Sequence, residues 1–375
     1  MITPSFSIGI EEEYLLIDKE TRGLASDPPQ AFFAACEDKL GNLVAHEFMK
    51  SQIEINTRVA KSVPEATEML AELRTTVIDT AANFNMAPIA ASTHPFSSWM
   101  DQDFTDQDRY ITIAEDLQEV VRRLLICGMH VHVGIDDDEL RIDLMNQVSY
   151  FLPHLLALST SSPFWQGRNT GLKSYRVSVW DEMPRTGLPY PFESYAEYCR
   201  HVDALVEAKI IEDGTKIWWD IRPSARYPTL EVRIADICTD IHDAASIAAL
   251  YQCLLRMLWR LKTNNQRWRQ YAGMLINENR WRAQRYGLDE GLVDFGKGTI
   301  VPCSDLIEEL IDLVQEDADA LGCTAELENL RQIEARGTSA HQQIRCYDDA
   351  IQSGKTEDEA LKAIVDHLVQ KTSDI

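Results

Sequence analysis

The chain has 375 residues, of which 45% are hydrophobic and 26% charged, so it is long enough to bury a large core without disulfide bonds or structural metals. Asp and Glu outnumber Lys and Arg by 60 to 36, and the resulting net charge of -24 argues against nucleic acid or an anionic membrane surface as a partner. The eight scattered cysteines include no C-x-x-C pair, and the N-terminus lacks the features of a signal peptide, which together predict a cytoplasmic protein with reduced thiols.

Hydrophobic periodicity and turn residues predict strands and helices in an irregular order. Up to residue 159, the expected strands are 5–18, 50–57, 88–92 and 127–135, and the expected helices are 29–40, 63–84, 108–125 and 136–159. Further along, the pattern predicts a helix at 194–211, strands at 216–221 and 229–234, and mainly helix from 241, interrupted near 287–302 and at 337.

This irregular order is typical of an α+β fold, in which a mostly antiparallel sheet is backed by helices. No shift in composition marks a boundary, so residues 1–375 are expected to form one domain with a mainly helical C-terminal part from about residue 241. Residues 162–191 are rich in Gly, Pro, Arg and aromatic residues without a clear period, and long irregular stretches of this kind are often functional.

Three consecutive glutamates stand in the first predicted strand. Because side chains alternate across a strand, Glu11 and Glu13 share one face and Glu12 takes the other. Two neighbouring carboxylates repel each other unless a positive charge lies between them, and a hard cation such as Mg²⁺ prefers oxygen ligands. A solvated edge strand with three exposed acids would explain the same segment.

Three more predicted strands place polar side chains opposite an apolar row. Glu54 lies between two isoleucines, His130 and His132 share one face of their strand, and Glu231 shares a face with Arg233. The histidines can ligate a metal or bind a substrate by hydrogen bonds, and Arg233 suits a phosphate. Each segment alone also has a structural explanation. The Glu54 segment could be a half-exposed strand, either histidine a buried core residue, and Glu231 with Arg233 a surface ion pair.

The agreement of the four strands carries more weight than any one of them. If their apolar rows pack against helices, the polar rows converge on one face of the sheet, where four carboxylates are costly to assemble without cations. Neither a P-loop nor a dinucleotide-binding fingerprint is present. Complementary charge is available from arginines in the irregular segment and beside the later strands, namely Arg168, Arg176, Arg185 and Arg222.

Seven segments spread over nearly the whole chain carry a family resemblance. They are 9–13 (GIEEE), 93–96 (THPF), 128–134 (GMHVHVG), 162–167 (SPFWQG), 219–223 (WDIRP), 231–236 (EVRIAD) and 279–283 (NRWRA). Together they resemble the glutamate–cysteine ligase type 2 family of carboxylate–amine ligases. The resemblance implies a curved, funnel-like antiparallel sheet like that of glutamine synthetase, with ATP and Mg²⁺ or Mn²⁺ bound on its concave face.

The resemblance also implies a reaction and a set of residues for it. ATP would phosphorylate the γ-carboxylate of glutamate or a similar acid, and an amine such as cysteine would then displace phosphate. Carried over by position, the implied metal ligands are Glu11, Glu13, Glu54, His130, His132 and Glu231. Glu231 and Arg233 are the implied catalytic residues, with Arg233 stabilising the transferred phosphoryl group. The implied binding residues for ATP or the substrate carboxylate are Arg176, Arg222, Asn279 and Arg280.

Two other functions remain open from the residues alone. A metal-dependent amide hydrolase would use His130, His132 and the glutamates to activate water, without ATP. A relative without catalytic activity would only bind nucleotide or metal. The sequence fixes neither the acceptor amine nor the oligomeric state, so a homo-oligomer is compatible with it.

Overall fold

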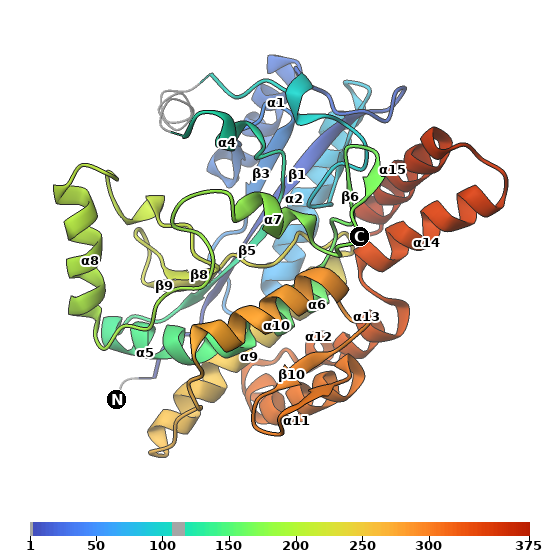
Figure 1. The fold of residues 1–375 in the computed structure, drawn as a ribbon. Coiled ribbons are helices and arrows are strands. Elements are labelled where there is room, and N and C mark those ends of the chain that lie inside the picture. The colour runs from blue at the N-terminus through green and yellow to red at the C-terminus, as the bar shows by residue number, and fades with distance from the viewer. Residues whose placement is uncertain (1–2, 107–116) are drawn as a thin grey trace.

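The structure is a computed structural model that describes residues 3–106 and 117–375. Its centre is an open antiparallel sheet of seven strands, with the order β2-β3-β1-β5-β9-β8 and with β4 paired to β1 (Figure 1). The strands are β1 (Ile8–Asp18), β2 (Val44–His46), β3 (Gln52–Asn56), β4 (Met86–Ile89), β5 (Met129–Gly134), β8 (Ile221–Pro223) and β9 (Thr229–Val232). This arrangement confirms the predicted α+β fold class.

Two long helices cover one face of this sheet. Helix α2 (Val63–Ala82) begins where the Ser62 side chain accepts a hydrogen bond from the Glu65 backbone N–H, and Pro64 fits its first turn. Helix α9 (Ile241–Thr263) packs against α2 and β5 and is buried along most of its length. The hydrophobic core that these helices form with the sheet includes buried residues from almost the whole sequence, from Phe6 to Leu368.

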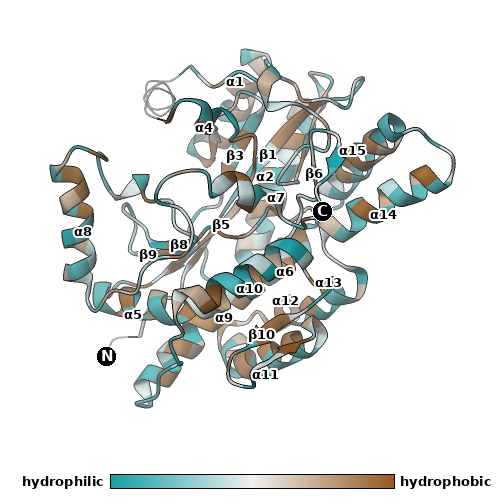
Figure 2. Ribbon diagram, viewed as in Figure 1, coloured by the Kyte–Doolittle hydropathy of each residue, from teal (hydrophilic) through white to brown (hydrophobic). Residues whose placement is uncertain are grey.

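The other described helices surround this centre. They are α1 (Gln30–Leu40), α4 (Glu119–Arg122), α5 (Asp138–Val148), α6 (Leu152–Ser159), α7 (Tyr175–Trp180), α8 (Tyr195–Glu207), α10 (Gly273–Tyr286), α11 (Cys303–Leu321), α12 (Thr324–Glu328), α13 (Leu330–Arg336), α14 (Ser339–Gln352) and α15 (Glu357–Ser373). Figure 2 shows hydrophobic residues gathered in the central strands and hydrophilic ones along much of α10. Among the described residues, no helix is both long and apolar enough to cross a bilayer.

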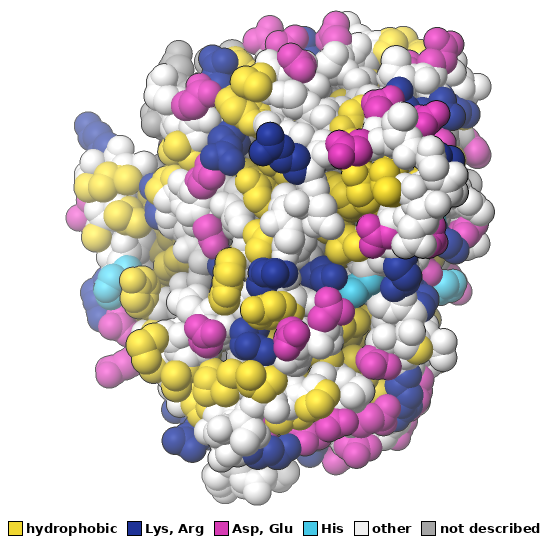
Figure 3. Space-filling model, turned by 45° about the vertical axis from the view of Figure 1, so that its right-hand side comes forward, with side chains coloured by type: hydrophobic (Ala, Val, Ile, Leu, Met, Phe, Trp, Pro, Cys, Tyr) yellow, Lys and Arg dark blue, Asp and Glu magenta, His cyan; other side chains and the backbone are white. Residues whose placement is uncertain are grey.

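The surface of the molecule is mixed in character. Figure 3 shows acidic, basic and hydrophobic side chains interspersed over the face that it presents, with neither charge sign covering the whole of it. The excess of acidic residues in the composition is therefore not visible on this face as one continuous acidic surface.

Several predicted elements differ from the structure for identifiable reasons. The helix expected at 136–159 is divided into α5 and α6 by a short 3₁₀ turn at Ser149–Phe151, and Pro153, which has no N–H, occupies the first turn of α6. The strand expected at 216–221 is wrong: a 3₁₀ turn occupies Gly214–Lys216, and β8 begins only at Ile221. Strand β8 lies at the edge of the sheet and has no neighbouring strand on its outer side, so Pro223, which lacks an N–H, is tolerated there.

The sequence also missed short elements. Strand β2 was not predicted, and neither were the hairpins β6 (Phe164–Trp165) with β7 (Arg168–Asn169) and β10 (Leu292–Asp294) with β11 (Thr299–Val301). The segment expected to be irregular therefore contains the first of these hairpins and α7. Half of the helix expected at 108–125 lies outside the described residues, and its described part contains α4.

Candidate functional site

The register of the sheet places the polar rows of four strands beside one another. Glu13 of β1 pairs with Glu54 of β3, and Glu11 of β1 pairs with His130 of β5. His132 of β5 pairs in turn with Glu231 of β9. Directly opposed residues in an antiparallel pair lie on the same face of the sheet, so these side chains converge on the face turned away from α2 and α9.

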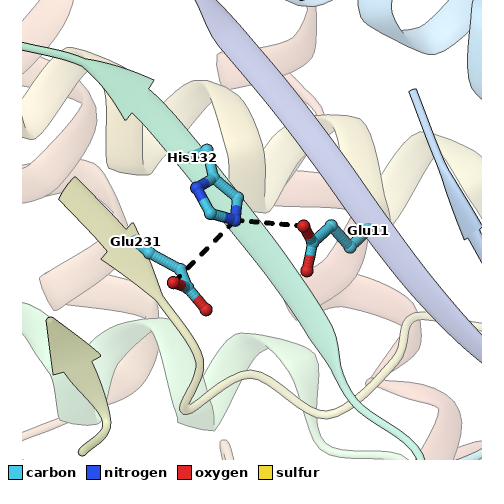
Figure 4. A group of neighbouring side chains, drawn as sticks. All are labelled: Glu11, His132 and Glu231. Carbon is cyan, nitrogen blue, oxygen red and sulfur yellow. Dashed lines mark ion pairs between the residues drawn. The ribbon is translucent and has the colours of Figure 1, made fainter. Parts of the chain in front are cut away.

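The first of two neighbouring groups joins Glu11, His132 and Glu231 (Figure 4). His132 Nε2 lies 3.2 Å from a carboxylate oxygen of Glu11 and 4.0 Å from one of Glu231. One ligand atom from each residue falls within 4.8 Å of the other two. His130 lies beside this group, with Nδ1 3.1 Å from Glu11 and Nε2 3.9 Å from Glu13.

The second group consists of three carboxylates, from Glu13, Glu47 and Glu54, whose oxygens also lie within 4.8 Å of one another. Sequence reasoning missed Glu47, which lies in the connection between β2 and β3 and therefore belongs to no alternating strand. The only available signal was its position in the short connection that precedes the strand of Glu54. Its backbone carbonyl accepts a hydrogen bond of 2.6 Å from the Thr105 hydroxyl.

Burial, reinforced by neighbouring carboxylates, raises the pKa values of the second group. Burial and the neighbouring charge of Glu54 raise the pKa of Glu13 to about 7. Burial and the charges of Glu13 and Glu54 raise the pKa of Glu47 well above its ordinary value, and burial with the charge of Glu11 raises that of Glu54. The raised pKa values favour the protonated forms of these carboxyl groups in the metal-free protein, and a divalent cation could take the place of the protons.

Opposite charges dominate the first group instead. Burial alone would raise the pKa of Glu11, but the hydrogen bonds and charges of His130 and His132 outweigh it and hold this pKa well below its ordinary value. For Glu231 the charges of Arg233 and Arg222 outweigh burial in the same way. Burial and the nearby Arg233 charge lower the pKa of His130 to about 4, so its imidazole is neutral at pH 7 and can ligate a metal.

Two arginines flank Glu231. Arg222 of β8 donates from Nε to Glu231 at 3.0 Å, and Arg233, which directly follows β9, also donates to the Glu231 carboxylate. Arg222 is further fixed by the backbone carbonyls of Thr215 and Ile217. Arg233 additionally approaches His130, with 3.4 Å between the guanidinium Nη1 and the imidazole Nδ1. The arginines thus bring positive charge to the edge of the carboxylate groups.

Arg176 of α7 lies buried behind the site. It donates to the backbone carbonyls of Arg233 at 3.0 Å and Ile234 at 3.2 Å, and its Nε has no hydrogen-bond partner among the described residues. A side chain at Gly128 would place its Cβ 2.4 Å from Nη2 of Arg176. The absence of a side chain there leaves space for the guanidinium. The backbone N–H of Gly128 donates to Glu13 at 2.6 Å, which links Arg176 to the carboxylate groups.

The structure does not bring Asn279 or Arg280 to the carboxylates. The Asn279 side chain exchanges two hydrogen bonds, of 2.7 and 2.8 Å, with the backbone of Val293. The Arg280 guanidinium is held between Asp181 and Asp220. We therefore do not assign these two side chains to ATP or substrate binding, because their donors are engaged within the protein.

Comparisons with known proteins agree with this architecture. The chain is 60% identical to a Rhodospirillum rubrum protein provisionally named glutamate–cysteine ligase 2, across 99% of this chain and 97% of that protein. A Jannaschia protein with the same provisional name is 54% identical, across 97% of this chain and 96% of its own length.

Solved structures share the fold at low sequence identity. A glutamate–cysteine ligase from Francisella tularensis, solved in complex with AMP, matches 98% of this chain and 89% of its own, with a TM-score of 0.66 and 14% identity. A bifunctional glutathione synthetase from Pasteurella multocida gives a TM-score of 0.69 at 14% identity over 97% of this chain, which spans only 52% of that protein.

The family model described as glutamate–cysteine ligase family 2 matches residues 7–367. That range includes every strand of the sheet and every residue of the two carboxylate groups. With this match and relatives of 60% and 54% identity, the chain belongs to glutamate–cysteine ligase family 2.

Proposed function

We propose that the protein is an ATP- and Mg²⁺-dependent ligase that joins the γ-carboxylate of glutamate, or a similar acid, to an amine such as cysteine. The observation that carries this proposal is the pair of acidic groups on one sheet face, flanked by Arg222 and Arg233. Family membership and the AMP bound to the Francisella ligase support ATP as the nucleotide.

The donor atoms fit the expected cation. Glu13, Glu47 and Glu54 offer only carboxylate oxygens, which Mg²⁺ prefers, and burial together with neighbouring carboxylates raises the pKa values of all three. Glu11 and Glu231 would hold a second ion together with His132, a ligand that Mn²⁺ also accepts. When bound, these ions neutralise the phosphate charges of the nucleotide.

The reaction would proceed in two displacements. A γ-carboxylate oxygen of glutamate attacks the terminal phosphorus of ATP, the bond to the β-phosphate oxygen breaks, and ADP leaves. The amine nitrogen then attacks the acyl carbon, phosphate leaves, and the amine loses a proton. In this proposal Arg233 stabilises the phosphoryl group during its transfer, as arginines do in other phosphoryl-transfer enzymes.

Nucleotide turnover with defined substrates tests this proposal. ADP release would be measured with ATP, Mg²⁺ and glutamate, in the presence and absence of a panel of amines that includes cysteine. We expect turnover to require both the acid and an amine, and Glu231→Gln to reduce it by at least about a hundredfold because one cluster ligand is lost. Amide hydrolysis that needs metal but no ATP would instead identify a hydrolase.

A further inference from the structure

Arg280 of α10 is a buried arginine held by two aspartates from different parts of the chain. Its Nε and Nη2 donate to Asp220 at 2.7 and 3.0 Å, and its Nη1 and Nη2 donate to Asp181 at 2.6 and 2.7 Å. Only 7% of Arg280 and 2% of Asp220 are exposed. Paired bidentate contacts of this kind fix orientation more strongly than a single ion pair.

Asp220 connects Arg280 to the backbone of Arg233. The carbonyl oxygen of Asp220 accepts hydrogen bonds from the backbone N–H groups of Arg233 at 2.8 Å and Ile234 at 3.1 Å. Asp220 also directly precedes β8, the strand that carries Arg222. A shift of Asp220 would therefore move the backbone from which the Arg233 side chain departs.

Asp181 connects Arg280 to the side chain of Arg233. Asp181 follows Trp180 at the end of α7. The guanidinium carbon of Arg233 lies 5.9 Å from the centroid of the Trp180 ring. Trp180 is anchored in turn by a hydrogen bond of 3.2 Å from its Nε1 to the carbonyl of Trp218. The cation–π contact helps to orient the guanidinium, which also bonds to Glu231, so a displaced Trp180 would change its orientation.

From these contacts we infer that Arg280 is a positioning residue for Arg233 and acts through Asp220 on its backbone and through Asp181 and Trp180 on its guanidinium. This inference rests on the proposed function, because it assigns to Arg233 a task in phosphoryl transfer. The ion-pair partners of Arg280 among the described residues are Asp181 and Asp220, and neither belongs to the two acidic groups, so its proposed role is to position Arg233 and not to bind a metal.

Substitution of lysine for Arg280 keeps the charge but cannot hold both aspartates. For Arg280→Lys we expect kcat to fall about 10- to 100-fold, because small misplacements of a catalytic group cost that much, while the KM for ATP stays within about twofold. Arg260→Lys is the matched control: Arg260 binds the buried Asp317, and its partners all belong to α11. This control should keep the wild-type kcat.

A double-mutant cycle separates positioning from simple support of the fold. In an Arg233→Lys background, Arg280→Lys should cost little further activity, because the group that it positions is already impaired. The inference is overturned if the two losses multiply, if the KM for ATP rises while kcat is kept, or if Arg280→Lys retains wild-type kcat. If Arg280→Lys does not fold, Asp181→Asn takes its place, since Asp181 is partly exposed.

A spectroscopic readout keeps this test independent of turnover. The protein is labelled with 5-fluorotryptophan, and the ¹⁹F resonance of Trp180 is assigned by its loss in Trp180→Phe. We expect this resonance to move in Arg280→Lys and in Asp181→Asn but not in Arg260→Lys. If wild-type protein shows no ligase turnover, the proposed function fails; an unmoved resonance overturns the positioning role whatever the turnover.

Discussion

Strand β1 carries three consecutive glutamates, and its two faces place them in different electrostatic environments. On the face toward α2, Glu12 is fully buried, and Arg74 donates to it from Nε at 2.8 Å and from Nη2 at 2.6 Å. The Tyr14 hydroxyl donates to the same carboxylate, and the remaining donors of Arg74 reach the carbonyls of Cys238 and Thr239. The charges of Glu12 and Arg74 thus balance each other within the protein.

On the other face, negative charge exceeds what the protein supplies to balance it. Glu13 lies against the carboxylates of Glu47 and Glu54, and the charges of Arg176 and Arg233 offset only part of the repulsion. Burial alone therefore does not separate structural from functional acids. Glu12 keeps the buried Arg74 charge paired, whereas the role proposed for the three carboxylates of the second group requires bound cations.

The largest expected effect is a crossed pair of substitutions in β1. Glu12→Gln should lower the free energy of unfolding by about 3–5 kcal/mol, because it leaves the buried Arg74 charge without its partner. Glu13→Gln should keep or raise the metal-free stability, because it removes repulsion, yet lower ligase activity by at least about a hundredfold. Urea unfolding and ADP release measure the two effects. If Glu13→Gln were the more destabilising, the distinction between the two faces would be wrong.

Added Mg²⁺ should stabilise the folded protein through the carboxylates of the second group. An ion bound only by the folded state stabilises it by about 2.7 kcal/mol when free Mg²⁺ is about 100 times its Kd. We expect thermal unfolding of the wild-type protein to shift upward by several degrees with Mg²⁺, and the shift to be much smaller in Glu54→Gln. Glu72→Gln, which changes an acid on α2 far from the two groups, is the control and should keep the full shift. Equal shifts in all three proteins would contradict a metal site at Glu54.

The raised pKa of Glu13 predicts how stability depends on pH. Because this pKa is about 7 in the folded metal-free protein and near 4.5 when unfolded, the folded state binds more protons between these pH values. The Glu13 contribution to stability is therefore fully present below about pH 4.5 and is lost as the pH rises to about 7. Relative to Glu13→Gln, wild type should lose on the order of 2 kcal/mol over this range.

Urea titrations of both proteins at several pH values, with and without Mg²⁺, measure this difference. Saturating Mg²⁺ should reduce the loss, because the cation takes the place of the proton. A difference of opposite sign would mean that Glu13 is already ionised and compensated in the folded protein.

The smallest expected effect concerns Asn279, which the family resemblance had placed near the nucleotide. Asn279→Ala removes two hydrogen bonds to Val293 and should cost about 1–3 kcal/mol of stability. The KM for ATP should not change, which steady-state kinetics would show. A clear rise in that KM at unchanged stability would return Asn279 to the nucleotide site.

Strand alternation made much of the site predictable. Because the side-chain period of a strand is fixed, the opposite directions of Glu11 and Glu12 follow from the sequence alone, and the apolar rows around Glu54 and His130 indicate their faces equally well. Glu47 was not predictable in this way, because it lies in a connection where no period constrains its side chain.

Long-range partners explain what else the sequence left open. The resemblance implies that Arg280 binds ATP or the substrate, but its partner Asp220 lies 60 residues away in the sequence and is brought to it by tertiary packing. The edge position of β8 is likewise set by the packing of the whole sheet, and it explains why Pro223 is tolerated in that strand. Such features come from tertiary packing, which local periodicity does not encode.

A crystal structure with Mn²⁺ and a non-hydrolysable ATP analogue would test the central claim most directly. Anomalous scattering locates the manganese ions independently of any assumption about their ligands. We expect one anomalous peak among Glu13, Glu47 and Glu54 and another among Glu11, His132 and Glu231, with the analogue's phosphates next to them. Nucleotide bound elsewhere, with no manganese at either group, would contradict it.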